Sequence, residues 1–275
     1  RADVPAAEET AHVIDHAKFR LDGRHVVVVG AASGIGEAVA VACGRQGARV
    51  ACVDVNAVGV QRVAAQVRAE GGQASAHAGD IAESSQVDAL FAELDRVAPI
   101  EGLACTPGVN VRKPLLSYTD EEFERVVRIN LRGNFNVLRA AGRLMTARGR
   151  GSIVLFSSIR AQVVEPGQSV YAATKAGVLQ LARAAAAEFG PRGVRVNAVA
   201  PGVTETPLTQ PIKAAPEWYA AYAAKRVFNR WATAEEMAWP TVFLLSDASS
   251  FVTGTMLAVD GGWLAADGRF TPPGM

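Results

Sequence analysis

The chain has 275 residues and nearly balanced charges: 28 Lys and Arg stand against 27 Asp and Glu, for a formal net charge of +1. Hydrophobic residues make up 49% of it, enough for a sizeable core. A charge so near zero excludes a general attraction to nucleic acid or anionic membranes. No apolar run approaches the roughly 18 residues that span a bilayer. We therefore expect a globular protein of one or two domains, with neither nucleic acid nor membrane as a partner.

The first 20 residues form a predicted N-terminal extension that is partly helical. They contain acidic residues and no apolar stretch, which excludes a secretory signal. The three cysteines are odd in number, far apart and set among small apolar residues, so we expect free thiols and a cytoplasmic location. No CxxC pair is present and the four histidines lack ligand spacing, so we expect no bound metal.

Short runs rich in Val and Ile alternate along the chain with longer segments of helical periodicity. This alternation predicts βαβ units, and runs that are apolar without a polar face are typical of parallel strands covered by helices on both sides. The expected fold is α/β, a Rossmann-type doubly wound parallel sheet of seven strands in a single domain over 21–262, followed by a C-terminal tail over 263–275. The predicted strands are 25–30, 49–54, 73–80, 102–106, 152–157, 194–199 and 256–260.

A glycine-rich turn follows the first predicted strand and precedes a helix. A helix N-terminus after such a turn points backbone N–H groups and the positive end of the helix dipole at a phosphate. Glycine is needed where a side chain would block the pyrophosphate of a dinucleotide. The spacing alone is weak evidence, because glycine turns end many strands, but its place between strand and helix strengthens it. The candidate cofactor residues of this turn are Gly30, Ser33, Gly34, Ile35 and Gly36.

Acidic residues end the next two predicted strands. Asp54 is placed to accept hydrogen bonds from the ribose 2′-hydroxyl of NAD and to repel the 2′-phosphate of NADP. Neither the turn nor Val55 offers a Lys or Arg, so NAD is the expected cofactor; the alternative is that Asp54 only caps its strand. Asp80 is expected either to bond the adenine amino group or to be the N-cap of the next helix.

A serine, a tyrosine and a lysine form the candidate catalytic group. Tyr171 and Lys175 are four residues apart within a helical pattern, so they lie on one helix face. The ordinary tyrosine pKa of about 10 is too high for a base at neutral pH, and a neighbouring ammonium lowers it. Ser158, at the carboxyl end of a parallel strand, is placed to hold a substrate oxygen. The three residues together therefore predict general acid–base chemistry on an alcohol or ketone.

In their order along the chain these motifs resemble those of the short-chain dehydrogenase/reductase family, over about residues 22–262. The resemblance implies a tetrad in which Tyr171 takes the hydroxyl proton, Ser158 holds the substrate oxygen and Lys175 lowers the Tyr171 pKa and bonds the nicotinamide ribose. Asn130 would hold, through its helix backbone, a water that links Lys175 to solvent. The motifs are Gly30-x-x-x-Gly34-Ile35-Gly36, Asp80, Asn130, Ser158, Tyr171-x-x-x-Lys175, Pro201-Gly202 and Thr206.

The resemblance implies further cofactor contacts. The segment from Pro201 to Thr206 would meet the nicotinamide carboxamide through its backbone and the Thr206 hydroxyl. One motif departs from the family pattern: Cys105-Thr106-Pro107-Gly108 replaces an Asn-Asn-Ala-Gly, so we expect the side-chain bonds that support the central sheet to be missing. Val29 likewise stands where the family often has Thr. The cofactor residues expected from the resemblance, besides the glycine turn, are Asp54, Asp80, Ile81, Gly108, Lys175, Pro201, Gly202, Val203 and Thr206.

Polar side chains after the fourth, fifth and sixth strands are the candidate substrate contacts. Arg160 is either an anchor for a carboxylate, phosphate or sugar hydroxyls or a rim arginine paired with Glu165 or solvent. The segment 209–230 is expected to form a short helical lid, or else to pack its aromatic residues in the core. The tail after 267 either reaches a neighbouring subunit or is a disordered end. The candidate substrate residues are Asn110, Arg160, Gln168 and Trp218.

The sequence thus predicts an NAD-dependent oxidoreductase acting on the secondary alcohol or ketone of a small molecule. The abundance of polar candidates favours a sugar, sugar acid or polyol. The alternatives are a 3-oxoacyl thioester reductase, a cyclic diol dehydrogenase or, in another class, an NAD-sensing regulator without catalysis. The resemblance implies a homo-oligomer, a tetramer or dimer, formed through helices around 130–148 and 169–188.

Overall fold

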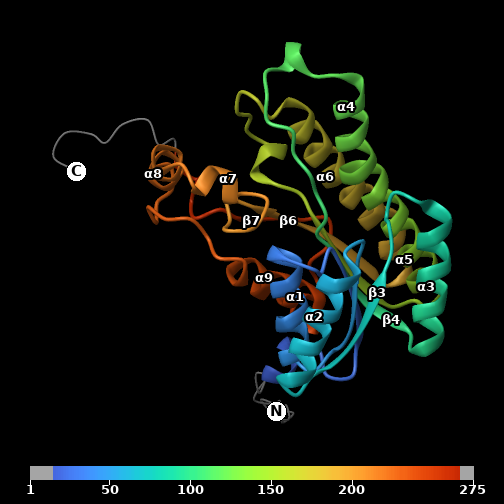
Figure 1. Cartoon of the computed structure of the whole chain (residues 1–275). Coiled ribbons are helices and arrows are strands. Elements are labelled where there is room, and N and C mark those ends of the chain that lie inside the picture. Colours follow the sequence, from blue (N-terminus) through green and yellow to red (C-terminus); the bar gives the residue numbers. More distant parts are fainter. Residues whose placement is uncertain (1–14, 267–275) are drawn as a thin grey trace, which may run out of the picture.

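The computed structural model describes residues 15–266. Its seven strands form one parallel sheet in the order β3-β2-β1-β4-β5-β6-β7, with helices on both faces (Figure 1). This confirms the predicted fold class. The strands are β1 (His25–Val29), β2 (Arg49–Asp54), β3 (Gln73–Ala78), β4 (Ile100–Cys105), β5 (Gly151–Phe156), β6 (Val194–Pro201) and β7 (Met256–Val259).

Strand β1 explains why the sequence shows no polar alternation. Val26 and Val28 point into one apolar core and Val27 and Val29 into the other, so every side chain of the strand is buried. Helices α1, α2 and α9 cover the first face, and α3, α5 and α6 cover the second. The larger helices are α1 (Gly34–Arg45), α2 (Ala57–Ala69), α3 (Ser84–Val97), α4 (Asp120–Val127), α5 (Asn134–Arg148), α6 (Ser169–Phe189) and α9 (Glu235–Leu245).

The chain reverses its direction of winding between β1 and β4. These strands are hydrogen-bonded neighbours, with Val29 opposite Cys105, although three helices separate them in the sequence. The loops that leave their carboxyl ends therefore diverge toward opposite faces of the sheet. Such a switch point opens a crevice in which doubly wound sheets bind ligands.

Helices α4 and α5 are joined without a loop by a π-helical turn, Arg128–Gly133. The wider turn shifts the register of the backbone bonds, and π-helical turns of this kind are frequent at functional sites. Asn130 lies in this turn and is fully buried. The local irregularity is therefore at a position that the sequence had marked as catalytic.

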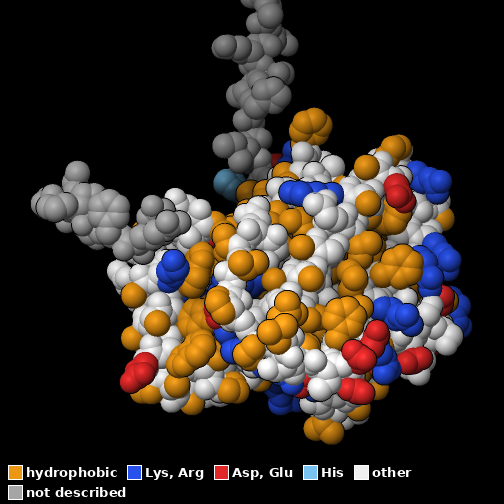
Figure 2. Space-filling model, turned by 90° about the horizontal axis from the view of Figure 1, so that it is seen from above, with side chains coloured by type: hydrophobic (Ala, Val, Ile, Leu, Met, Phe, Trp, Pro, Cys, Tyr) orange, Lys and Arg blue, Asp and Glu red, His pale blue; other side chains and the backbone are white. Residues whose placement is uncertain are grey.

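Between β6 and α9 the chain forms two short helices, α7 (Gln210–Lys213) and α8 (Pro216–Ala224), which lie beside the carboxyl ends of the strands (Figure 1). Tyr219, Tyr222 and Trp231 pack there in a small core of their own, together with Trp263. The space-filling view shows both charge signs spread among hydrophobic side chains on the face it presents (Figure 2). Among the described residues, no helix combines the length and the apolar character needed to cross a membrane.

At the N-terminal end, the described part of the predicted extension includes a 3-10 helix, His16–Phe19. Leu21, directly after it, is fully buried against the α1 and α9 side of the sheet. The remainder of the extension and the tail after 266 lie outside the described residues. The expectation that the tail either contacts a neighbouring subunit or is disordered falls there.

Candidate active site

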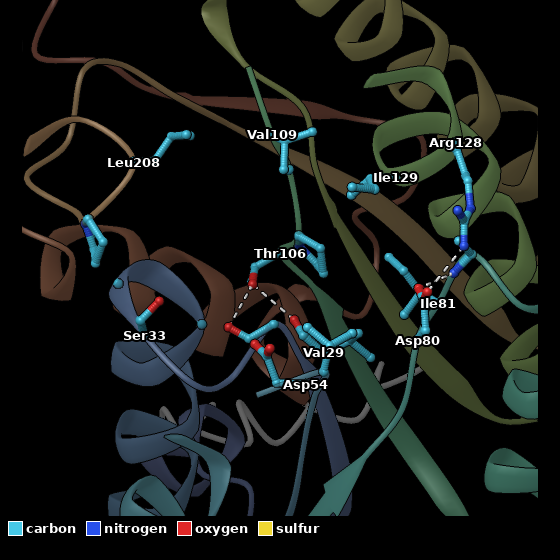
Figure 3. A pocket seen from close by; sticks show the side chains of 18 of the residues that line it. Val29, Ser33, Asp54, Asp80, Ile81, Thr106, Val109, Arg128, Ile129 and Leu208 are labelled. Carbon is cyan, nitrogen blue, oxygen red and sulfur yellow. Dashed lines mark hydrogen bonds and ion pairs between the residues drawn. The ribbon is translucent and has the colours of Figure 1, made fainter. Parts of the chain in front are cut away.

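A cleft of about 850 Å³ lies at the carboxyl ends of β1, β2 and β4. It opens at the switch point, and the glycine turn, the β2 end and the loop after β4 form its walls (Figure 3). The structure brings together here most of the residues that the sequence assigned to the cofactor. Those lining this cleft are Gly30, Ser33, Gly34, Ile35, Gly36, Asp54, Asp80, Ile81, Gly108 and Thr206.

The glycine turn has the geometry that a dinucleotide requires. Gly30 and Gly34 have φ angles of 82° and 57°, in the left-handed region that favours glycine. A Cβ on Gly36 would come within 2.0 Å of the Gly30 carbonyl oxygen. Ser33, the N-cap residue of α1, makes no side-chain capping bond, so the first N–H groups of a twelve-residue helix remain available. These residues fit a bound pyrophosphate.

Asp54 lines the cleft and also organises the turn. One carboxylate oxygen accepts from the Ala32 N–H at 3.2 Å and the other from the Asn56 N–H at 3.0 Å. Sequence reasoning missed Arg62 of α2, which donates to the Ala32 carbonyl at 3.1 Å and so approaches the same corner. Its guanidinium is bound through two nitrogens to Glu37 at 2.7 and 2.6 Å, so this cation is already neutralised.

Asp80 is not the N-cap of α3, because that position belongs to Glu83. The Asp80 carboxylate accepts from the Ala82 N–H at 2.9 Å, and Arg128 approaches its other oxygen at 3.4 Å (Figure 3). Arg128 also binds Glu83 at 2.8 Å. This arrangement leaves Asp80 on the cleft wall, where a hydrogen bond to a base is geometrically available.

The departure at Cys105-Thr106-Pro107 has a different effect from the one expected. We expected the side-chain support of the central sheet to be lost, and that expectation was wrong. The Thr106 hydroxyl donates to the Val29 carbonyl at 2.9 Å and bridges the ends of β1 and β4 (Figure 3). The hydroxyl lies so close to the turn that a Cβ on Gly30 would come within 2.4 Å of it.

A second cavity, of about 330 Å³, adjoins the cleft and shares Gly108 and Thr206 with it. Ser158, Tyr171 and Lys175 all line this second cavity, which we call the reaction chamber. The remaining predicted cofactor residues, Pro201, Gly202 and Val203, line it as well. The three candidate catalytic side chains therefore meet next to the dinucleotide-shaped cleft, although Ser158 caps the 3-10 helix that follows β5 and α6 carries the other two.

Lys175 is held at the boundary of the two cavities. Its ammonium donates to the Phe156 carbonyl at 2.8 Å, and its Nζ lies 5.7 Å from the centre of the Tyr171 ring. A Cβ on Gly108 would come within 3.1 Å of Nζ, so glycine leaves room for the ammonium there. Lys175 is 3% exposed, and burial lowers its pKa to about 8.

The Tyr171 phenol experiences opposing influences. Burial has the largest effect and raises the Tyr171 pKa above its ordinary value, although the Ser158 hydroxyl and the nearby Arg160 and Arg112 guanidiniums act in the opposite direction. We expected Lys175 to be the main cause of a lowered pKa, but the Lys175 ammonium is directed to the Phe156 carbonyl instead. The two arginines are therefore cations that sequence reasoning did not connect with the phenol.

Asn130 lies beneath the chamber wall. Its side chain accepts from the Val109 N–H at 2.8 Å and donates to the Val109 carbonyl at 2.9 Å, which fixes the loop after β4. It also donates to Thr174 on α6 at 3.1 Å, and its backbone carbonyl accepts from Asn134. Asn130 thus ties together the segments that carry Gly108 and Lys175.

The low pKa of Lys175 has a consequence for stability. At pH 7 the lysine is charged in both states, and a folded-state pKa of about 8 instead of 10.5 corresponds to a cost of about 3 kcal/mol. Lys175→Met removes that cost and loses one hydrogen bond. We therefore expect the free energy of unfolding at pH 7 to be about 1–3 kcal/mol higher in the variant than in the parent.

The pH dependence checks this interpretation. Between pH 8 and 10.5 the unfolded chain binds the Lys175 proton more tightly than the folded chain, so the stability of the parent rises with pH. Urea unfolding at pH 7 and pH 10 should show the advantage of Lys175→Met shrinking at the higher pH. A parent that is more stable than the variant at pH 7 would contradict the assigned cost of burying the ammonium.

Three of the four predicted substrate residues line the reaction chamber: Asn110, Arg160 and Gln168. Arg160 is paired with Glu165, as one alternative proposed, but it is 5% exposed and so does not lie on the rim. Trp218 requires a correction: it is 48% exposed and supports Arg112, whose Cζ lies 5.5 Å from its ring, instead of lining the chamber. Its helix α8 packs its inner face into the separate aromatic core instead.

Segment 209–230 divides between the chamber wall and the aromatic packing that was the alternative to a lid. Pro211 and Ile212 of α7 line the reaction chamber, as do Leu208 and Thr209 before it. The aromatic side chains of α8 instead pack on Trp231, with the Tyr219 and Trp231 rings stacked at 5.1 Å. Helix α7 therefore borders the chamber, and α8 is anchored in the separate aromatic core.

Comparison with known proteins agrees with this geometry. The short-chain dehydrogenase family model described as Enoyl-(Acyl carrier protein) reductase matches residues 30–264. Galactitol 2-dehydrogenase (L-tagatose-forming) of Cereibacter sphaeroides is 38% identical over 89% of this chain and 96% of its own. The 3-oxoacyl-(acyl-carrier-protein) reductase FabG of Thermotoga maritima is 33% identical over 89% and 99%.

A solved structure gives the same result for the fold. Gluconate 5-dehydrogenase from Burkholderia cenocepacia, crystallised with NADP and tartrate, superposes with a TM-score of 0.88 and 34% identity. The alignment covers 91% of this chain and 98% of that one. On its glycine turn, its Ser-Tyr-Lys chamber and these similarities, the chain belongs to the short-chain dehydrogenase/reductase family, whose relatives named above are oxidoreductases.

Proposed function

We propose that this chain is an NAD-dependent oxidoreductase that moves a hydride between nicotinamide and the secondary alcohol or ketone of a sugar, sugar acid or polyol. The observation that carries the proposal is the meeting of Ser158, Tyr171 and Lys175 in one chamber that opens into the glycine-turn cleft. The relatives named for galactitol and gluconate act on compounds of this kind, which supports the substrate class.

The chain's own residues supply the proton transfer and the positioning. When bound, the nicotinamide ring is the acceptor or donor of the hydride. Tyr171 removes the proton from the substrate hydroxyl in oxidation, and Ser158 holds the same oxygen by a hydrogen bond. The Arg112 and Arg160 guanidiniums oppose the effect of burial on the Tyr171 phenol. The Lys175 ammonium, held by the Phe156 carbonyl, would bond a ribose hydroxyl of the cofactor. Pro211 and Ile212 exclude water from the chamber.

The choice of NAD over NADP rests on the β2 corner of the cleft. Asp54 would accept from a ribose 2′-hydroxyl and repel a 2′-phosphate, and Arg62, which approaches the turn, is bound to Glu37. The Burkholderia structure contains NADP, so the fold alone does not decide between the two cofactors.

A homo-oligomer, either a dimer or a tetramer, is proposed with α5 and α6, the helices around 130–148 and 169–188, at the interface. Phe135 on α5 is a large apolar side chain left nearly half exposed, and so is Phe123 on α4. A cytoplasmic location is proposed because all three cysteines are free and buried, the condition expected in a reducing compartment.

A substrate screen tests the proposed function. Purified protein is mixed with NAD and a panel of sugars, aldonates, alditols and cyclic diols, and the NADH absorbance band is followed. The reverse reaction is run with NADH or NADPH on 3-oxoacyl thioesters. Formation of NADH with polyhydroxy compounds is the expected result. Turnover of 3-oxoacyl thioesters alone would instead establish the reductase alternative, and NAD binding without any turnover would favour the regulator.

A further inference from the structure

We propose that the substrate is a polyhydroxy carboxylate and that Arg160 binds its carboxylate inside the reaction chamber. The inference rests on the proposed function and narrows it from sugars, sugar acids and polyols to the acids. Three features of the described residues carry it: the charges that line the chamber, the way Arg160 is held, and an acceptor oxygen of Asn110 that has no donor.

The chamber lining carries only one sign of charge. Arg112, Arg160 and Lys175 line it, and among the described residues no Asp or Glu does. Glu165 lies behind the lining and compensates one of the three cations. The half-buried chamber therefore keeps a surplus of positive charge, which is costly to hold away from water without a partner. An anionic substrate supplies that partner, and a neutral polyol does not.

Arg160 is fixed as a rigid recognition group. One nitrogen, Nη2, donates to Glu165, and the face of the guanidinium lies against Trp263, with Cζ 5.2 Å from the ring centre. Within residues 15–266, neither Nε nor Nη1 donates to any acceptor of the chain. A guanidinium that is held at one end and stacked on one face presents its remaining N–H groups to a carboxylate with little loss of entropy.

Glu165 acts as a clamp on this side of the chamber. It accepts from Arg160, from Arg112 and from the Tyr222 hydroxyl. Burial on its own would raise the Glu165 pKa, but the Tyr222 hydroxyl and the two guanidiniums lower it below its usual range, so the carboxylate stays ionised at neutral pH. It therefore orients both arginines while neutralising only one of them.

The position of Arg160 favours a short acid. Its side chain lines the same chamber as Ser158 and Tyr171, and its guanidinium lies near enough to Tyr171 to act on the pKa of the phenol. A carboxylate bound to this guanidinium would therefore share one small chamber with the carbon that reacts. A chamber of about 330 Å³ suits a short polyhydroxy acid.

Asn110 supplies a complementary acceptor for hydroxyl groups. Its amide nitrogen donates to Gln168 at 3.0 Å, which fixes the orientation of the side chain. Its Oδ1 atom is buried and accepts from no donor in the part of the chain that the structure describes. Because Asn110 lines the chamber, a substrate hydroxyl is the donor that would satisfy it. A polyhydroxy acid carries both required groups.

Matched substrate pairs test the inference. Each aldonate is compared with the alditol of the same carbon skeleton, such as D-gluconate with D-glucitol and D-galactonate with galactitol. We expect kcat/KM to favour the acid by about 10- to 100-fold, the range for a charged hydrogen-bonded contact. Arg160→Gln should abolish most of this preference by raising KM for the acid. The loss of a cation beside Tyr171 should lower kcat for the acid and for the alditol by the same factor, so the ratio between the two substrates isolates the carboxylate contact.

Two further variants keep the test decisive. Lys213→Gln is the control variant: it removes the positive charge of Lys213 on α7, which forms an exposed ion pair with Glu205. It should leave the acid preference unchanged. Arg160→Lys keeps the charge but loses the planar fork, so it should retain part of the preference. If Arg160→Gln does not fold, as judged by its circular dichroism, the test uses the acid-to-alditol ratio of kcat/KM in the parent and in Arg160→Lys.

The outcomes separate this inference from the proposed function. Equal or better use of the alditol by the parent, or an equal loss of both substrates in Arg160→Gln, would overturn the carboxylate assignment and leave the polyol activity standing. Turnover of neither member of any pair, with reduction of 3-oxoacyl thioesters, would overturn the proposed function itself.

Discussion

Replacing Tyr171 with Phe is expected to lower kcat by about 10²- to 10⁴-fold while leaving dinucleotide binding unchanged. The phenol oxygen is the proposed proton acceptor, and loss of a positioned acid or base has an effect of this size. The ring itself is retained, so packing beside Lys175 and Ser158 is preserved. Steady-state rates of the parent and the variant, with an NADH fluorescence titration of each, measure the two quantities separately.

Ser158→Ala serves as the matched comparison for this experiment. It removes a hydrogen-bonding hydroxyl from the same chamber but leaves the phenol in place, so a smaller loss of kcat is expected. If Tyr171→Phe kept a rate within tenfold of the parent, the phenol would not be the general base. A variant that lost NADH binding together with activity would show instead that Tyr171 shapes the cofactor site.

Neutralising Asp54 is expected to raise the use of NADP relative to NAD by about 10- to 100-fold, since each charged hydrogen bond contributes about 1.5–3 kcal/mol. Asp54→Asn keeps one of the two acceptor oxygens, so it can accept from either the Ala32 or the Asn56 N–H but not from both, and the glycine turn should be partly preserved. Asp54→Ala loses these bonds as well. The ratio of kcat/KM for the two cofactors is the measurement, and an unchanged ratio in both variants would remove Asp54 from the 2′ position.

Glu37 offers a way to separate repulsion from attraction at this corner. Glu37→Gln leaves Arg62 without its two-nitrogen ion pair, and the guanidinium already reaches the Ala32 carbonyl. Added to Asp54→Asn, this change should raise NADP use further, because a free cation then faces the 2′-phosphate. Glu37→Gln alone should have little effect while Asp54 remains charged.

The fold was predictable because its determinants are local. The Val-rich run 25–30 and the turn that follows it carry strand, turn and helix signals within about twenty residues. All seven predicted strands are present in the structure within about two residues at most of their ends. The π-helical turn at Asn130 was not predictable in the same way, because its wider turn has no periodicity of its own.

The chemistry of the site was predictable where one helix or one turn carries it. Tyr171 and Lys175 lie four residues apart on α6, and Gly30 to Gly36 form one turn, so spacing alone places these groups. The clamp around Glu165 depends instead on Arg112, Arg160 and Tyr222, which come from three separate segments. Contacts between segments that are far apart in the sequence cannot be predicted from residue spacing.

Two further features depended on contacts between distant segments. The prediction for Thr106 considered only that the family usually has an asparagine at this position. In the structure, the Thr106 hydroxyl donates to the Val29 carbonyl across the sheet. Trp263 was assigned to the tail, whereas its ring packs on Tyr222 and against Arg160. In both cases the role of the side chain depends on a residue that is distant in the sequence, so the local sequence could not predict it.

The central claim is that this chamber moves a hydride between a carbinol carbon and NAD with Tyr171 as the base. It is tested most directly with the alcohol found in the screen, deuterated at its carbinol carbon. The account predicts that the reduced cofactor gains one deuterium, with a primary isotope effect on the chemical step, and that Tyr171→Phe forms labelled cofactor at least about 100-fold more slowly. Reduced cofactor without deuterium, or undiminished transfer in Tyr171→Phe, would contradict it.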